Sequence, residues 1–388
     1  MEPPSPLPPS PVQRCRRWFE SLSPLHAALF AGFLAWAITT LLYAPPFWMP
    51  LAGGGPSSAR IDDFIKMCRN PLARDLFEPI LAYRITTPAL AWALGLRGFS
   101  GVILQYSAIV ATLCIVFHVM AKRTDRLLAL WTTVGVAVTY TIIWTNTKPG
   151  FPDAVTHLAV AVTLLSTSPI IALIATVFGT LNDERFVLAI PFVLLWFADE
   201  ESFFVTIRNL WKLALGFATG LAIALAFRHA LTVGWIGSSI VKPQVYNEIQ
   251  TLAWSPWLGW KLFFINTVLA NRAMWLVLLA WTPGRLVSIR NWTDYACLLA
   301  LLFAVAASTV VADVSRSIGF AFPWILIGMA KAFQDDSRFA RRLCSVSVIL
   351  CILTPAFYFP GKVQWHRPLP LSIYRASSGW DLMDLIRK

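Results

Sequence analysis

Ten ionisable residues of this chain are of the types used in acid–base and phosphate chemistry. An aspartate or glutamate can take a proton from a hydroxyl group, and an arginine can hold a phosphate through charge-assisted hydrogen bonds. The candidate residues are Asp62, Asp63, Arg84, Asp153, His157, Glu184, Arg185, Arg272, Asp313 and Arg316. A site that combines them can activate a hydroxyl and bind a phosphate.

The composition indicates whether the protein that carries such a site is in water or in a membrane. Of the 388 residues, 57% are hydrophobic and 13% are charged, whereas a soluble domain has about 25% charged residues. The protein is therefore expected in a membrane. The net charge of +12 and the 18 tryptophans fit basic loops at lipid headgroups and an aromatic belt, and not a nucleic-acid partner. Six scattered cysteines without CxxC spacing argue against a metal cluster or a disulfide framework.

Apolar segments predict an all-α fold, a polytopic transmembrane helical bundle of about 10–11 spans. The candidate spans are residues 26–44, 100–121, 126–145, 153–166, 169–180, 186–198, 209–228, 259–281, 293–311, 316–333 and 343–359. Segments 169–180 and 186–198 are short, and alternatively form one broken hairpin that enters the membrane only partly. Segment 86–97 is too short for a span and is interpreted as an interfacial helix.

The chain then divides into three parts. Residues 1–25 are Pro-rich and basic, and are expected to be disordered and cytoplasmic. Residues 26–359 form the transmembrane domain, in which 45–99 is a long first extracytoplasmic loop, and 360–388 form a C-terminal tail. Short basic turns at 121–126, 283–292 and 331–343 are placed in the cytoplasm by the positive-inside rule. Counting 86–97 as a span would reverse the side of every later turn.

With this threading the polar clusters at the helix ends lie on the extracytoplasmic side. They are Asp62 and Asp63, Arg84, Asp153, the turn 182–185, and Asp313 with Arg316. Ionisable groups at the lip of a bundle usually face a polar cavity. Each cluster also has a plainer interpretation, as a solvated loop, a helix cap, an ordinary turn or a local ion pair.

Two further candidates depend on where helices begin. Asp153 and His157 are four residues apart on one helix face, so they are a metal-binding or proton-relay pair or a buried hydrogen-bonded pair. Arg272 lies inside the span 259–281, where a charge is costly unless it is paired and is by default functional. If that span begins near residue 268, Arg272 lies at the interface instead.

Several short motifs, in their order along the chain, carry a family resemblance. They are NPLARDLFEPILAYRITTPALAWAL (70–94), PDAVTHLAV, NDERFVLAIP and DVSRSIGFAFP. Over residues 26–335 the chain resembles bacterial polytopic membrane proteins related to the GT-C glycosyltransferases. The resemblance implies an outward-facing site that transfers a sugar, with inversion, from a polyprenyl-phosphate donor to an envelope glycan or lipid acceptor.

Site roles follow from the resemblance. Asp62 or Asp63 is the general base, and the sequence DDF, where relatives often have an Asp followed by a Tyr, leaves open which of the two it is. The leaving phosphate would be met by Arg84, Arg185, Arg316 or Arg272. Asp153, Glu184 and Asp313 would position the sugar or acceptor, and His157 belongs to the same group. The need for a divalent cation, Mg or Mn, stays open because GT-C enzymes differ in it.

Two other classes are retained as alternatives. A membrane transporter or flippase of a lipid-linked or anionic substrate is one, although no internal repeat supports it. A non-catalytic subunit of an envelope polysaccharide system is the other. All three place a multi-pass protein in the bacterial inner membrane, in contact with membrane lipid and with a cytoplasmic N-terminus.

Overall fold

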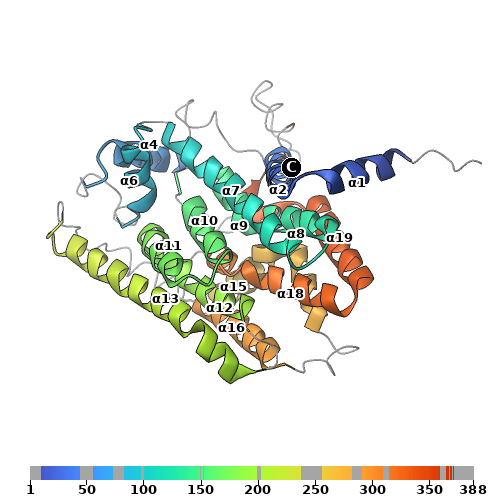
Figure 1. The fold of residues 1–388 in the computed structure, drawn as a ribbon. Helices are drawn as coiled ribbons and strands as arrows, with labels where there is room; N and C mark the ends of the chain where they lie inside the picture. Colours follow the sequence, from blue (N-terminus) through green and yellow to red (C-terminus); the bar gives the residue numbers. More distant parts are fainter. Residues whose placement is uncertain are drawn as a thin grey trace, which may run out of the picture.

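The protein is a bundle of helices of unequal length (Figure 1). The computed structural model describes residues 10–43, 56–72, 83–97, 100–148, 150–151, 153–198, 202–236, 256–281, 291–308, 314–358, 364–366, 368 and 370. Within them the one sheet is a two-stranded antiparallel hairpin, β1 (Ala356–Tyr358) with β2 (Gln364–His366), in which Ala356 lies opposite His366. The expectation of a helical fold is confirmed, with this hairpin as the one exception in the part of the chain that the structure describes.

The helices follow the order of the apolar segments. In the first half they are α1 (Pro11–Ser21), α2 (Pro24–Leu42), α4 (Pro56–Arg69), α6 (Thr86–Ala93), α7 (Gly101–Ala121), α8 (Arg126–Ala137), α9 (Tyr140–Thr147), α10 (Asp153–Thr163) and α11 (Pro169–Asn182). In the second half they are the 3-10 helix η3 (Glu184–Ala189), α12 (Ile190–Trp196), α13 (Phe203–Thr232), α15 (Pro256–Asn271), the 3-10 helix η4 (Arg272–Trp281), α16 (Trp292–Ser308), α17 (Val314–Gly319), α18 (Pro323–Asp335) and α19 (Ser337–Leu353).

Four helical stretches of the described chain are long and apolar enough to cross a membrane. They are α2, α7, α13 and the stretch Phe263–Ala280. A fifth is obtained if α8 and α9, which meet at a 55° bend, count as one span. The architecture is thus consistent with a multi-pass membrane protein.

Several segments expected to be continuous spans are broken. The span 186–198 divides into η3 and α12, the span 343–359 ends as a helix at Leu353 before β1, and three more break as follows. The span 126–145 divides into α8 and α9, and the span 316–333 divides into α17 and α18, where Pro323 begins the new helix. Proline suits the first helical turn because its missing N–H would have no intrahelical partner there. The span 259–281 breaks at Arg272, a non-glycine residue with a positive φ of 52°. Apolar composition does not reveal such breaks, since a bent span and a straight one bury similar side chains.

The N-terminal region differs from its expectation. Residues Pro11–Ser21 form α1, so the expected disorder of residues 1–25 is wrong for this stretch. A capping box begins the helix: the Gln13 amide donates to the Ser10 side chain, and the Ser10 amide donates to the Gln13 side chain. At its other end, the Arg126 guanidinium donates to the carbonyls of Glu20 (2.8 Å) and Leu22 (2.7 Å).

Several turns lie together with α1 at one end of the bundle. Arg126 joins the α7–α8 turn to α1, and Asp125 in that turn is 3.3 Å from Arg341 near the start of α19. Arg123 donates to the Trp196 carbonyl at the end of α12. Two basic turns predicted to share a side, 121–126 and 331–343, therefore do so, while most of the third, 283–292, lies outside the described residues. We call this the α1 end.

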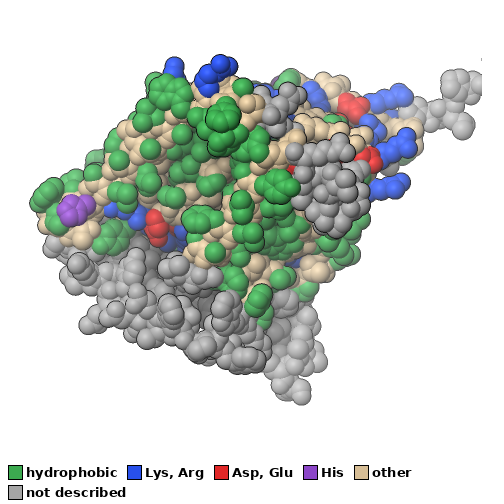
Figure 2. All heavy atoms as spheres, turned by 90° about the horizontal axis from the view of Figure 1, so that it is seen from below, with side chains coloured by type: hydrophobic (Ala, Val, Ile, Leu, Met, Phe, Trp, Pro, Cys, Tyr) green, Lys and Arg blue, Asp and Glu red, His purple; other side chains and the backbone are tan. Residues whose placement is uncertain are grey.

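The opposite end carries α4 and α6 (Figure 1), and many large hydrophobic side chains of the described helices are exposed between the two ends. Figure 2 shows hydrophobic side chains over much of the described surface in that view, with one group of Lys and Arg at the α1 end and a few other charged side chains elsewhere. Such a distribution suits a bundle whose middle is in hydrocarbon and whose ends are at the headgroups.

Helices α11 and α13 pack along a seam of close backbone approach. A Cβ at Gly216 would lie 2.4 Å from the Pro169 carbonyl oxygen, and a Cβ at Gly220 would lie 2.7 Å from the Leu173 carbonyl oxygen. Two glycines four residues apart allow helices in lipid to gain packing that bulkier residues would prevent. The seam fixes α13 beside α11, and therefore beside the turn that follows α11.

Candidate functional site

A cluster of buried charges lies at the end of the bundle away from α1. We call it the ionic cluster, and its members are Arg84, Asp153, Asp183, Arg185 and Arg316. They come from the segment before α6, the first turn of α10, the turn between α11 and η3, and α17. Four segments far apart in the sequence thus converge on one site.

Asp153 is held mainly by one arginine. The Arg316 side chain donates through both Nε and Nη2 to the two carboxylate oxygens of Asp153. Arg84 Nη1 approaches the same carboxylate at 3.4 Å. The Asp153 side chain is completely buried, so its charge depends on these partners and on the start of α10, where a carboxylate is favourable.

Asp183 is surrounded by three guanidinium groups. Arg185 donates through Nε at 2.7 Å and Nη2 at 2.5 Å, one bond to each oxygen. Arg84 Nη2 lies 3.3 Å and Arg316 Nη2 lies 3.4 Å from Asp183 Oδ2. Arg84 and Arg316 therefore each contact both aspartates, and the cluster is one connected network.

Local hydrogen bonds set the position of the α11–η3 turn. Asp183 ends α11 and begins η3, where its Oδ1 accepts from the Arg185 amide at 3.1 Å. The neighbouring Asn182 accepts from the amide (3.1 Å) and the hydroxyl (2.6 Å) of Thr87 in α6, and donates to Thr156 in α10 at 2.7 Å. The Asn182 side chain therefore holds α6 against the α11–η3 turn. Arg84, which is three residues before Thr87, is thereby kept close to Asp183.

The electrostatics of Asp183 are the balance of two opposing effects. Burial alone raises the pKa of its carboxyl group, but Arg185, Arg84 and Arg316 together hold that pKa well below its usual range. Burial also lowers the pKa of the Arg84 guanidinium, as does the charge of Arg316, while the two aspartates raise it. An arginine remains protonated in any such setting, so Asp183 and the three arginines around it are charged at neutral pH.

Aromatic rings complete the walls of the cluster. The Arg316 guanidinium lies over Phe151, 4.8 Å from the ring centroid, and over Trp144 at 5.6 Å. Arg185 lies over Phe320 at 5.1 Å. These rings keep water from the charges and attract the cations through their faces.

His157 lies one turn beyond Asp153 and is buried, with its ring 4.5 Å from that of Phe320. Neither ring nitrogen has a hydrogen-bond partner among the described residues, so the expected Asp153–His157 hydrogen bond is absent there. In the same part of the chain no group of three or more His, Cys, Asp or Glu side chains could hold a metal ion. His157 is a buried group with unused hydrogen-bonding capacity beside the ionic cluster.

Glu184 differs from its neighbours in the same turn. Its side chain is 57% exposed and pairs with Arg228 of α13 at 2.9 Å, and Arg228 also donates to the Thr180 carbonyl at 2.7 Å. The buried acid of the turn is Asp183, which was not among the ten candidates. Arg228 was missed too, because it lies near the end of a long apolar helix with no acidic residue close by in the sequence.

Asp62 and Asp63 lie on α4, away from the face that packs. Phe64 and Cys68 of that helix are buried against Ala91 and Val102. Asp62 is exposed, and Asp63 is half-buried and 3.5 Å from Lys66. No hydrogen bond or ion pair joins either aspartate to the ionic cluster within the described residues. Asp313 lies outside the described residues.

Arg272 lies elsewhere in the bundle and has a different set of partners. Its guanidinium donates to the Val138 carbonyl at 2.9 Å, to the carbonyls of Cys351 and Thr354, and to the Tyr43 hydroxyl at 2.5 Å. These groups end or follow α8, α19 and α2. The contacts satisfy a buried cation with protein atoms alone, so the predicted role of Arg272 in phosphate binding gains no support from them.

Comparison with known proteins found no match for this chain. No protein-family model, no curated protein and no solved structure matches this chain. The resemblance to the GT-C glycosyltransferases therefore rests on the sequence motifs, and four of the candidate residues, Arg84, Asp153, Arg185 and Arg316, are the ones that the structure brings together.

Proposed function

We propose that this protein is an integral membrane glycosyltransferase of the GT-C type. It would move a sugar from a polyprenyl-phosphate donor to an envelope glycan or lipid acceptor. The observation that carries the proposal is the convergence of three arginines on two buried aspartates at one end of an apolar bundle. Arginine forks match the geometry of a phosphate, and a buried charged network in a membrane protein usually marks a substrate site.

The donor phosphate would bind where Arg84 and Arg316 now bridge the two aspartates. Both arginines have contacts of 3.3–3.4 Å to carboxylate oxygens, which are longer than the bonds that Arg185 makes. These contacts are the ones that a phosphate oxygen can replace at least cost. Arg185 makes a short bidentate ion pair with Asp183. It would hold this carboxylate in place while the phosphate replaces the other contacts.

In the proposed reaction, Asp62 or Asp63 takes the proton of an acceptor hydroxyl. The hydroxyl oxygen bonds to the anomeric carbon as the bond from that carbon to the phosphate oxygen breaks, and polyprenyl phosphate leaves with the bonding electrons. The arginines stabilise the charge that develops on the leaving phosphate. The placement of α4 supports a base on α4 and a phosphate at the arginines. Helix α4 packs on α6, and the Thr87 hydroxyl of α6 donates a hydrogen bond to Asn182, which is next to Asp183.

The membrane arrangement belongs to the same proposal. The bundle would cross the bilayer ten or eleven times, with α1 in the cytoplasm and the ionic cluster at the extracytoplasmic surface of a bacterial inner membrane. Its support is that the shorter apolar helices α10 and α11 lie between the longer candidate spans along the chain, and the shorter apolar helix α16 follows them. A metal requirement is left to experiment.

The direct test is sugar transfer in membranes supplied with polyprenyl-phosphate-linked sugars. We expect Arg84→Gln and Arg316→Gln each to lower transfer about 100-fold or more, the usual effect of removing a donor that stabilises developing charge. Arg341→Gln, at the α1 end, is the matched control and should retain activity. Asp62→Asn and Asp63→Asn, separately and together, identify the base, and full activity in all three would contradict that assignment. Activity with and without EDTA decides the metal question.

One observation favours a second candidate. Asp62 is exposed and neither aspartate of α4 contacts the ionic cluster in the described structure, as expected if the cluster binds an anionic lipid-linked substrate without transferring it. A transporter or flippase would show saturable binding of polyprenyl phosphate, lost in Arg316→Gln, and would move that lipid across proteoliposomes with no sugar transfer. Transfer without movement would support the enzyme instead.

A further inference from the structure

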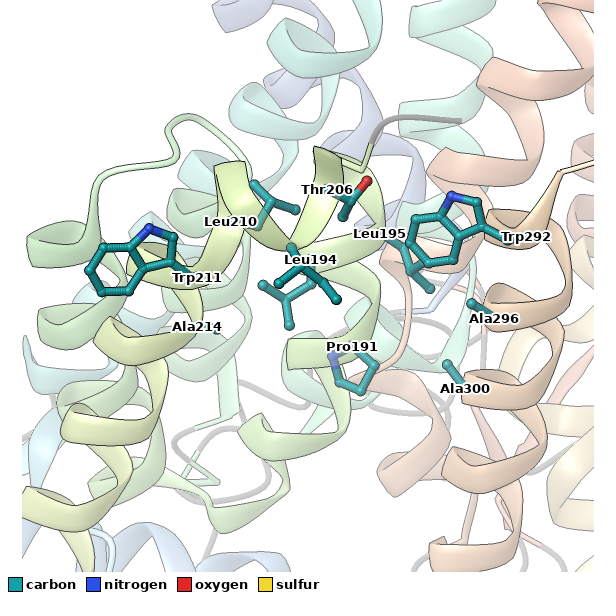
Figure 3. Close-up of a pocket in the computed structure, with 11 residues that line it drawn as sticks. Pro191, Leu194, Leu195, Thr206, Leu210, Trp211, Ala214, Trp292, Ala296 and Ala300 are labelled. Atoms are coloured by element: carbon teal, nitrogen blue, oxygen red, sulfur yellow. The ribbon is translucent and has the colours of Figure 1, made fainter. Parts of the chain in front are cut away.

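A second candidate ligand site lies between α12, α13 and α16, away from the ionic cluster. It is a cavity of about 510 Å³, within the range of roughly 300–1,000 Å³ that is typical of small-molecule sites. Figure 3 shows Leu194 and Pro191 of α12 between Leu210 of α13 and Ala300 of α16. Thr206 is the one lining residue with a hydroxyl group, and the rest of the lining is apolar.

The cavity lies in the half of the bundle near the α1 end. Its α12 residues precede Trp196, whose carbonyl accepts a hydrogen bond from Arg123 of the α7–α8 turn. Its α13 residues lie in the first half of that helix, whereas Arg228, near the other end of α13, reaches Glu184 beside the ionic cluster. The two ends of α13 therefore serve two different sites.

Exposed apolar side chains occur on the same helices as this cavity. Phe204 and Leu215 of α13 and Leu299, Leu302 and Phe303 of α16 are large apolar side chains that are mostly exposed. In a bilayer these side chains contact acyl chains, so a molecule that enters the cavity sideways from the bundle surface comes from the hydrocarbon region. The molecule most able to enter the cavity by this route is therefore an acyl chain.

Charges at the flank of the cavity indicate what is attached to that chain. Ile207 and Trp211 line the cavity, and Arg208 and Lys212 are the next residue after each. At about 100° per residue, Arg208 lies about 60° around the helix from Trp211, at the edge of the lining face. Lys212 lies further around the helix, but its Nζ is 5.6 Å from the centroid of the Trp211 ring. Both cations are exposed, and no ion pair joins either of them to a described acidic residue. Trp211 and Trp292 line the cavity from opposite sides (Figure 3), as suits rings at the headgroup level.

We propose that this cavity binds one acyl chain of an anionic phospholipid from the leaflet at the α1 end, with Arg208 and Lys212 at its phosphate. Helix α13 has 30 residues and is about 45 Å long at 1.5 Å per residue. It exceeds the hydrocarbon thickness of about 30 Å, which lets these two cations reach the headgroups. This site is independent of the proposed transfer reaction.

The test uses full-length protein in vesicles of phosphatidylglycerol and phosphatidylcholine, with either lipid carrying a photoreactive group in its acyl chain. We expect labelled phosphatidylglycerol to cross-link to peptides of α12, α13 and α16 at least three times more than labelled phosphatidylcholine. Ala214→Phe places a ring in the cavity and should reduce this labelling at least threefold. Ala222→Phe, on an exposed position of the same helix, is the matched control and should leave it unchanged.

The headgroup assignment has its own pair of variants. Arg208→Gln with Lys212→Gln should remove the preference for phosphatidylglycerol while labelling at the cavity persists. Arg14→Gln with Arg17→Gln removes two exposed cations of α1 and should not change the preference. Equal labelling in Ala214→Phe and Ala222→Phe, or protection of the cavity by another segment of this chain, would overturn the proposed site. An unchanged preference in the Arg208 and Lys212 double variant would overturn its selectivity for anionic lipid.

Discussion

Buried arginines occur in two regions of this bundle, and the two are neutralised in different ways. Arg272 donates mostly to backbone carbonyls that end helices, together with the Tyr43 hydroxyl. In the ionic cluster the acceptors are the side-chain carboxylates of Asp153 and Asp183. A carbonyl at a helix end is part of the fold, whereas a carboxylate can give up an arginine to another anion. Burial of charge alone therefore does not separate a structural contact from a binding site, but the chemical type of the partner does.

The largest effect in this comparison is expected for Arg272→Gln. Glutamine cannot reach all of these acceptors, so several carbonyls and the Tyr43 hydroxyl lose a charged donor. We expect the variant to lose about 3–5 kcal/mol of stability, measured as thermal unfolding in detergent. Arg126→Gln is the matched control, because Arg126 also donates to backbone carbonyls but at the surface, and it should lose far less. Similar losses in the two variants would contradict the structural role of Arg272.

An intermediate effect is expected from acid. The folded-state pKa of Asp183 is held well below its usual range, so its ion pairs contribute fully above the unfolded pKa of about 4. They are lost as the pH falls below that value and through the folded pKa. The unfolding temperature in detergent should therefore decline below about pH 4 and be nearly constant above it. Asp183→Asn should be less stable at pH 7 and decline less steeply in acid. A wild-type decline that begins near pH 6 would point to other groups.

The smallest effect is expected for Glu184→Gln, one residue from Asp183. The Glu184 side chain is 57% exposed, although its partner Arg228 is mostly buried, and exposed pairs contribute about 0–1 kcal/mol. Unfolding should shift by no more than this amount. A transfer activity that falls sharply in Glu184→Gln, with unchanged unfolding, would instead show that this side chain positions a substrate as the sequence suggested.

Much of this arrangement could be predicted from the sequence, and the failures have physical reasons. Arg84, Asp153, Arg185 and Arg316 were predicted to share a site because charges between apolar segments gather where those segments end. In the turn NDER, however, the choice between Asp183 and Glu184 depends on which side chain faces α10 and α17, and no local pattern encodes that. The break at Arg272 was also not predictable, since a cation held by carbonyls of two helices, α8 and α19, and by the Tyr43 hydroxyl at the end of α2 is a tertiary effect.

The glycine seam between α11 and α13 has a consequence for how the protein is made. Helix α11 has 14 residues, about 21 Å at 1.5 Å per residue, and is too short to cross the hydrocarbon alone. Helix α13 is long enough, but it is synthesised later. We therefore expect α11 to reach its final depth only when α13 leaves the ribosome and docks through Gly216 and Gly220. The ionic cluster, which needs α17 as well, would then be one of the last features to form during biosynthesis.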